Sequence, residues 1–271
     1  MGQRFLSLSS ISLGAFILAM TWPAAAEDNA DELAKQLSNP IANLISVPFQ
    51  SNFEWGAGAD GNGFAYTLNI QPVIPISISD DWTMISRTIL PVAYRDYLPP
   101  PDGNTFGLGD ITQSLFFSPK APGPGGLIWG VGPAFLIPTA TDDFLGAGKF
   151  GIGPTAVVLE QTGPWTVGVL ANHIWSVAGD NDRDEINSTF LQPFLAYALG
   201  HGTTLNLNTE STYDWVADQW TVPINLGVSQ VFKIGEQAMS IQVGGKYYAE
   251  APEGAPEWGI RTTLTLLFPE K

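Results

Sequence analysis

Polar and apolar residues alternate along most of the chain. In the stretch 203–215, Leu205 and Leu207 share one parity, whereas Asn208 and Glu210 share the other. A period of two indicates a β-strand with one apolar and one polar face. The polar face is too charged for the core of a β-sandwich. The pattern therefore points to an all-β chain whose strands separate an apolar surrounding from a polar interior.

Twelve segments of the chain show this alternation. They are 46–55, 63–78, 82–97, 107–118, 127–138, 151–161, 165–177, 188–199, 203–215, 220–232, 238–249 and 258–268. Longer, acid-rich connections alternate with tighter ones, and aromatic residues gather near the segment ends. An even strand number with long loops on one side is typical of a transmembrane antiparallel β-barrel of an outer membrane. In such a barrel, both termini lie on the short-turn side.

Composition excludes several functional classes. The formal net charge is −15, so the chain lacks the basic surface that nucleic acids require. It has no cysteine, which excludes disulfides, thiolate catalysis and zinc–thiolate sites. With only two histidines, we expect no metal site and no cofactor.

The N-terminus resembles an export signal. Arg4 supplies a positive start, an apolar run reaches Met20, and Ala24–Ala26 suits a signal peptidase. We expect residues 1–26 to be a cleaved signal peptide and the protein to reach the outer membrane of a Gram-negative cell. Its partners would be outer-membrane lipid and lipopolysaccharide, the barrel-assembly machinery and a small-molecule solute, with no nucleic acid.

Residues 27–45 have a helical pattern ahead of the barrel domain, 46–271. Asn29 and Glu32 have capping-box spacing, and Asn39-Pro40 suggests that a second helix starts there. Two short amphipathic helices are therefore expected. They would form either a packed N-terminal arm or a plug of the lumen.

One feature conflicts with a closed barrel. Proline donates no ladder hydrogen bond and normally marks edges or bulges. Within the expected strands lie Pro48, Pro72, Pro75, Pro91, Pro133, Pro138, Pro154, Pro193 and Pro223. Either these prolines form bulges or some strand boundaries are wrong, and a soluble exported β-protein stays an alternative.

Several stretches resemble a known bacterial family. They include LNIQPVIPISI, VGPAFLIPTATDD, NTESTYDW and VPINLGVSQVFKIG. Over nearly the whole mature chain, the sequence resembles the phenol-degradation meta-pathway family of outer-membrane transporters. The resemblance implies a transmembrane barrel that passes small, apolar or aromatic compounds. It carries no site residues over to this chain, and Pro269 follows Phe268 where a terminal aromatic is usual.

The expected lumen holds one polar row. Counting outward from each turn aligns Gln192 with Glu210, Glu210 with Asn225, Asn225 with Lys246, and Lys246 with Arg261. Arg95 would face Asp110, with Arg87 deeper on the same strand. Because a charge facing lipid costs roughly 2–4 kcal/mol at mid-membrane, these side chains should face inward. They form either a solute-selecting constriction or a packed interior with no open path.

Catalysis finds little support in the sequence. His173 and Ser176 suit a lipase by type, but they point to opposite faces of a strand, and His173 is expected inside, opposite Gln192. Asp180 and Asp182 start a calcium-like loop that lacks the required glycine. We therefore expect no catalytic residues and no enzyme. The sequence favours a channel for small solutes, with a closed structural or adhesion barrel bearing acidic loops as the alternative.

Overall fold

The computed structural model describes residues 24–97 and 103–269, with only the backbone for the first five of them. The strands are β1 Ile45–Ala57, β2 Gly63–Ile70, β3 Val73–Ser77, β4 Trp82–Arg95, β5 Thr105–Leu108, β6 Ile111–Pro119, β7 Ile128–Ile137, β8 Lys149–Thr162, β9 Trp165–Gly179, β10 Asn187–Gly200, β11 Thr203–Thr209, β12 Ser211–Asp214, β13 Gln219–Ile234, β14 Gln237–Glu250 and β15 Trp258–Phe268. One helix, α1 Ala24–Leu37, precedes them, and a short 3-10 turn, Pro124–Gly126, links β6 to β7.

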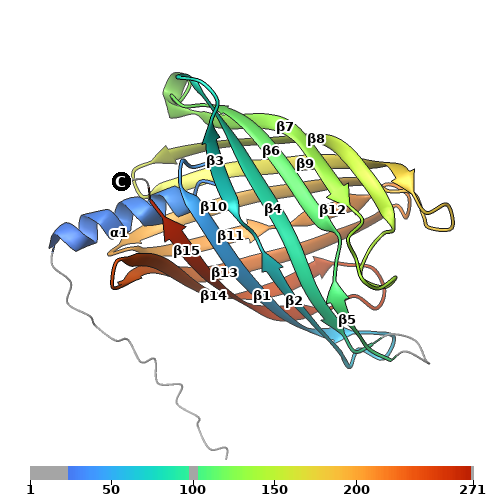
Figure 1. Ribbon diagram of the computed structural model, residues 1–271. Coiled ribbons are helices and arrows are strands. Elements are labelled where there is room, and N and C mark those ends of the chain that lie inside the picture. The colour runs from blue at the N-terminus through green and yellow to red at the C-terminus, as the bar shows by residue number, and fades with distance from the viewer. Residues whose placement is uncertain (1–23, 98–102, 270–271) are drawn as a thin grey trace, which may run out of the picture.

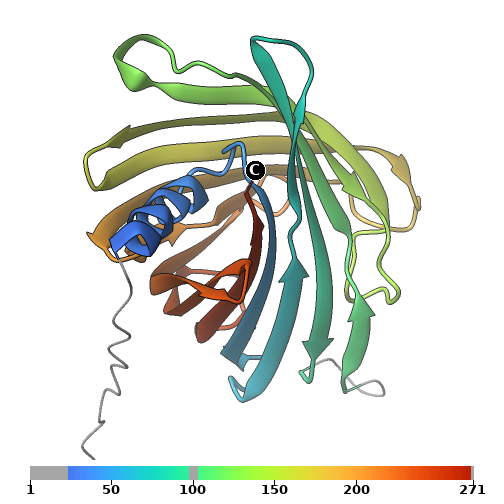
Figure 2. The same cartoon turned by 60° about the vertical axis from the view of Figure 1, so that its left-hand side comes forward.

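The strands form one closed antiparallel barrel (Figures 1 and 2). Closure comes from β1, which pairs with β15 from Ile45↔Phe268 to Trp55↔Trp258. Three barrel strands are interrupted, so β2 continues as β3, β5 as β6, and β11 as β12. The barrel therefore has twelve strands, and the predicted count and fold class are confirmed.

The prolines do not open the wall. Pro72 lies in the break between β2 and β3, and Pro223 lies at a register shift between β13 and β14. Pro48 and Pro193 instead sit within continuous registers. The two expected explanations, bulges and wrong strand boundaries, therefore account for Pro223 and Pro72 but not for Pro48 and Pro193. Beside Pro133, a Cβ on Gly132 would lie 1.9 Å from the carbonyl oxygen of Leu115, so glycine lets the two strands approach closely there.

Helix α1 lies at the end of the barrel that carries the short turns, beside the last strand (Figures 1 and 2). Its Ala30 and Leu33 pack with Val231, Ala238 and Leu267, close to where β13, β14 and β15 begin or end. The side chain of Asp31 accepts a hydrogen bond from the backbone N–H of Gly202, in the β10–β11 turn. The helix is thus fixed to the short-turn rim.

The two-helix expectation is wrong. Residues Asn29 and Glu32 lie inside α1, because the preceding alanines are strong helix formers and extend it upstream. After Leu37 no second helix forms. Asn39 makes a single turn, with its Oδ1 accepting from Ile41 N and its carbonyl accepting from Ala42 N, and the chain must then enter β1. The signal-peptide prediction falls mostly on residues 1–23, outside the described residues.

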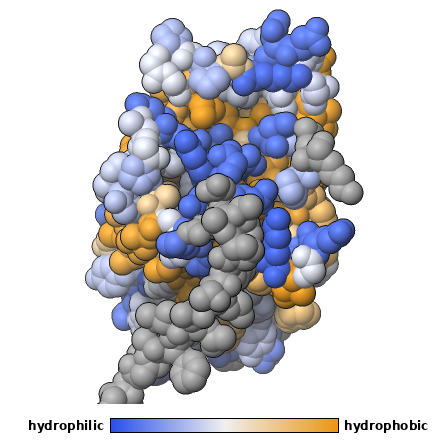
Figure 3. All heavy atoms as spheres, turned by 90° about the vertical axis from the view of Figure 1, so that its left-hand side faces the viewer, coloured by the Kyte–Doolittle hydropathy of each residue, from blue (hydrophilic) through white to orange (hydrophobic). Residues whose placement is uncertain are grey.

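The outer surface of the barrel is apolar, as an outer-membrane barrel requires. Trp55 stacks on Trp258 at the long-loop end, with ring centroids 4.7 Å apart. Near the short turns, Trp165 packs on Tyr197 and Trp82 on Trp129. In the view onto the α1 end, hydrophilic residues gather at the middle of the face and hydrophobic ones at its flanks (Figure 3). Among the described residues, no helix has the length and apolar character needed to span a membrane.

Candidate functional site

An arginine–carboxylate pair links two non-adjacent barrel strands on one side of the lumen. Glu210 lies at the break between β11 and β12, and Arg261 lies on β15. Arg261 Nη1 donates to Glu210 Oε1 at 2.8 Å, and Nη2 donates to Oε2 at 2.7 Å. Arg261 Nε donates to Asn52 Oδ1 at 2.8 Å. The bidentate geometry fixes both side chains and occupies both carboxylate oxygens.

A second pair lies nearer the long loops. Lys246 Nζ on β14 donates to Glu54 Oε1 on β1 at 2.7 Å, and both side chains are 8% exposed. The hydroxyl of Tyr248 donates to the same oxygen, also at 2.7 Å. Buried charges are tolerated only where they are paired and hydrogen-bonded. These two pairs brace one side of the barrel interior.

The interior has two chemically different walls. The polar wall comprises the inward residues of β1, β11 and β13–β15, together with Glu210. It includes Ser46, Gln50, Asn52, Glu54, Asn206, Asn208, Asn225, Ser229, Ser240, Gln242, Lys246, Arg261, Thr263 and Thr265. The apolar wall is a cluster of inward apolar residues on β4 and β6–β10, strands that also carry the buried Thr83, Ser114, Ser118, Thr155 and Thr166. Its members are Ile85, Phe116, Ile128, Val157, Leu159, Leu170, Phe190 and Phe194.

Arg87 stands at the seam between the walls. It lies on β4, two residues from Ile85 and on the same face, opposite Val73 and Ser114 in the register. Its Nη2 donates to Gln71 Oε1 at 3.2 Å. Among the described residues, no ion pair includes Arg87.

The segment from Ser38 to Leu44, here called the arm, runs from α1 to β1 at the short-turn end. Ile41 enters the apolar wall, where its Cδ1 would lie 3.3 Å from a Cβ placed on Gly130. The arm separates two cavities, and both are lined by Asn39 and Ala42.

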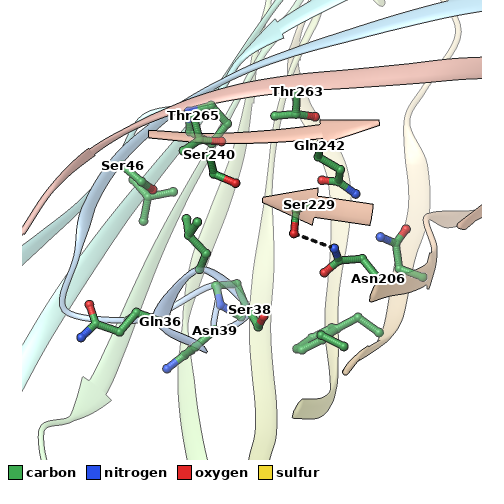
Figure 4. A pocket seen from close by; sticks show the side chains of 18 of the residues that line it. Gln36, Ser38, Asn39, Ser46, Asn206, Ser229, Ser240, Gln242, Thr263 and Thr265 are labelled. Carbon is green, nitrogen blue, oxygen red and sulfur yellow. Dashed lines mark hydrogen bonds between the residues drawn. The ribbon is translucent and has the colours of Figure 1, made fainter. Parts of the chain in front are cut away.

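The first cavity, of about 260 Å³, lies on the polar-wall side of the arm and reaches Arg87 and Phe194. Figure 4 shows Ser240, Gln242 and Thr263 projecting from the barrel strands toward Ser38 and Asn39 across it. The second cavity, of about 420 Å³, faces the β6–β7 turn and includes Ile41 and Trp129.

The expected polar row changes in detail. The registers on both sides of Gln192 and Glu210 place them opposite each other, and Asn225 pairs with Lys246, both in the predicted alignment. Two alignments are wrong by two residues. Asn225 lies opposite Asn208, and Arg261 lies opposite Gly244. A shift of two keeps every side chain on its face, so the row still lines the lumen.

The predicted Arg95–Asp110 pair does not form. Arg95 lies opposite Thr105, and its Nη1 donates to the carbonyl oxygens of Tyr66 and Tyr94. Asp110 lies in the break between β5 and β6. Its carboxylate accepts from the backbone N–H groups of Ala140 and Ala147, which hold the following long loop. The counted alignment is five residues off, because β4 already ends at Arg95 and β5 begins at Thr105, so the connection begins earlier than the counting assumed.

Glu54 is a site residue that was not predicted from the sequence. Glu54 shares parity with Asn52 and Gln50, opposite Phe53 and Trp55, so alternation alone could have placed it inside. Which base it would meet depended on barrel closure, because Glu54 and Lys246 belong to the first and eleventh barrel strands.

His173 faces outward, contrary to expectation. It lies opposite Thr189, three residues from the predicted partner Gln192, and an odd shift reverses the face. Its Nδ1 is 2.7 Å from Thr189 Oγ1, and its ring packs on the exposed Trp175. Ser176 instead donates its hydroxyl hydrogen bond to Glu185.

Two long loops are tied together at the barrel mouth. Lys149 Nζ donates to Glu185 Oε1 at 2.9 Å, and Arg183 donates to the carbonyl oxygens of Asp143, Gly146 and Ala147. The Ser176 hydroxyl, and then Lys149, lower the pKa of the Glu185 carboxyl below its ordinary value of 4.5. Within 180–184, Asp180 Oδ1 accepts from Asp182 N, which is a local turn.

Comparison with known proteins identifies the architecture. No family model and no curated protein matches the chain. The COG4313 outer membrane channel from Pseudomonas putida F1 is similar in structure, with a TM-score of 0.64 and 16% identity over 83% of this chain and 94% of that one. Outer membrane phospholipase A from Escherichia coli is also similar, with a TM-score of 0.48 and 11% identity over 84% and 90%. The chain has the fold of outer-membrane β-barrels.

The exclusion of enzymatic activity is corrected by this comparison. Solved barrels that resemble this one include a phospholipase, so a barrel architecture does not by itself exclude catalysis. Identities this low show a common fold and assign no activity to the chain.

Proposed function

We propose that the protein is an outer-membrane channel that passes small solutes, and that it belongs with the phenol-degradation-associated channels its sequence resembles. The observation that carries the proposal is the amphipathic lumen. A barrel that only anchors loops needs a filled interior, whereas this one keeps two cavities, of which the first lies on the polar-wall side of the arm and the second at the β6–β7 turn. The structural likeness to an outer membrane channel supports the same function.

The two walls favour solutes that are partly apolar. A freely hydrated ion gains nothing from Val73, Ile85 and Phe194, which line the cavities, because apolar surface offers it no ligands. An apolar or aromatic body would bury its surface there, at roughly 25 cal/mol per Å², while its polar group stays on the opposite wall. The expected location is the outer membrane, in contact with its lipid and lipopolysaccharide.

Planar-bilayer recording of the refolded protein tests this function. We expect discrete conductance steps from the wild type. The variant Ile41→Ala should conduct more, because it removes the side chain that the arm inserts into the apolar wall. Heat-modifiable gel mobility reports folding, and Ala42→Ser serves as a conservative arm control.

A closed structural barrel is the second candidate, and one observation favours it. The arm contributes Ile41 to the buried apolar cluster, so it fills part of the lumen. If wild type and Ile41→Ala both fold but neither conducts, the interior is sealed and the channel proposal fails.

A further inference from the structure

The acidic and basic side chains that face the lumen are not equal in number. Between the two rims, the described residues supply Glu54 and Glu210 as inward acids, and Arg87, Lys246 and Arg261 as inward bases. The two acids are committed. Glu210 uses both oxygens for Arg261, and Glu54 binds Lys246 and Tyr248 through one oxygen. One guanidinium, that of Arg87, therefore lacks a carboxylate partner.

The surroundings of Arg87 make this imbalance significant. Its recorded hydrogen bond goes to a neutral amide, that of Gln71. Glu210 attracts it only through space. A partly buried guanidinium without an anion has lost part of its hydration, and a carboxylate bound to it in the two-pronged geometry offsets that loss.

The first cavity gives such an anion a place. Arg87 lines it together with Val73 and Phe194 of the barrel and Leu37 and Leu44 near the arm. Its volume of about 260 Å³ suits a molecule of roughly ten non-hydrogen atoms, at the small end of ligand sites. One end thus presents a positive charge, and adjacent surface is apolar.

We propose that this cavity binds small monocarboxylates with an apolar body, and that Arg87 holds the carboxylate. The inference rests on the proposed channel function, because the occupant would be the solute on its way through. The apolar body lies against Phe194 and Val73. The amide of Gln242 on the polar wall, which lines the same cavity, offers donors to the same carboxylate.

Equilibrium binding to the folded barrel in detergent tests this assignment. The probes are benzoate, its neutral analogue benzamide and the cation benzylamine. We expect wild type to bind benzoate at least tenfold more tightly than benzamide, and benzylamine not at all, since a charge-assisted hydrogen bond is worth more than a neutral one. Arg87→Gln should remove the preference for benzoate. Arg95→Gln, at the long-loop rim and outside the cavity, should leave the preference unchanged.

Channel recordings separate the two proposals. Benzoate should block chloride current in wild type and not in Arg87→Gln. If wild type conducts but binds benzoate and benzamide equally, the carboxylate site is wrong and the channel stands. If wild type binds benzoate through Arg87 but never conducts, the site stands and the channel fails. The benzoate–benzamide comparison on wild type decides the matter even if Arg87→Gln does not fold.

Discussion

The two walls of the lumen are stabilised in different ways. On the apolar wall, Phe116 and Leu159 are almost fully buried and pack closely. On the polar wall, Glu210 and Arg261 are held by paired charges. Truncating a side chain in a close-packed cluster leaves a cavity that destabilises the fold, whereas removing one partner of an ion pair leaves an unpaired charge. Stability should therefore depend most on the apolar wall, and ion preference on the polar wall.

The largest expected effect comes from the apolar wall. Phe116→Ala should lower the free energy of unfolding by about 3–5 kcal/mol, because it leaves a cavity in a fully buried cluster. Ion preference should not change, since no charge is altered. Urea unfolding in lipid vesicles measures the first quantity and reversal potentials the second. The outward neighbour Phe117 is the control, and equal losses from Phe117→Ala would contradict the packed wall.

A somewhat smaller loss is expected on the polar wall. Glu210→Gln should lower the free energy of unfolding by about 3 kcal/mol, because Arg261 keeps its charge in a confined site without a carboxylate. The double variant Glu210→Met with Arg261→Met should regain most of this stability. Glu160→Gln, a change at an exposed acid on β8, is the control. A double variant as unstable as the single one would show that the charges do not compensate each other.

Charge reversal at Lys246 should reverse selectivity, and it should also lower stability, because the new carboxylate would face Glu54 in a buried site. With Lys246→Glu, the inner wall changes from one excess base to one excess acid, so its anion preference should become a cation preference. A lumen charge in a low-dielectric wall is screened less than one in bulk water. Reversal potentials in a salt gradient should change sign. Lys233→Glu, near the short-turn rim and exposed, should leave the sign unchanged.

The smallest effect lies outside both walls, at the barrel mouth. The depressed pKa of Glu185 means that its contacts with Ser176 and Lys149 stabilise the loop above pH 4.5, the ordinary value. This contribution is lost as pH falls through the lowered folded-state pKa. Carboxyl chemical shifts of Glu185, followed by NMR in detergent, should show the lowered pKa. In Ser176→Ala the pKa should rise toward 4.5, and an unchanged value would contradict the hydroxyl's role.

Counting residues outward from each turn predicted which face of a strand a residue occupies better than it predicted the residue opposite it on the next strand. Across the 216–219 connection the counted register is two residues from the observed one, because β12 already ends at Asp214 and the turn begins earlier. Because the error is two residues, the polar side chains stay on the lumen face. The odd error at His173 reversed the face, which shows that alternation within a strand is more dependable than arithmetic across loops.

The sequence by itself determined the twelve strands and which residues of one strand share a face, because a strand between lipid and an interior must alternate. Only the tertiary structure decided which charges meet. Glu54 and Lys246 are brought together by closure of β1 on β15, almost two hundred residues apart in the chain. The arm's course also depends on the tertiary structure, because Ile41 packs against Ile85, Phe116 and Val157. Arg87 is unmatched because Arg261, far along the chain, occupies both oxygens of Glu210, and no local pattern predicts either contact.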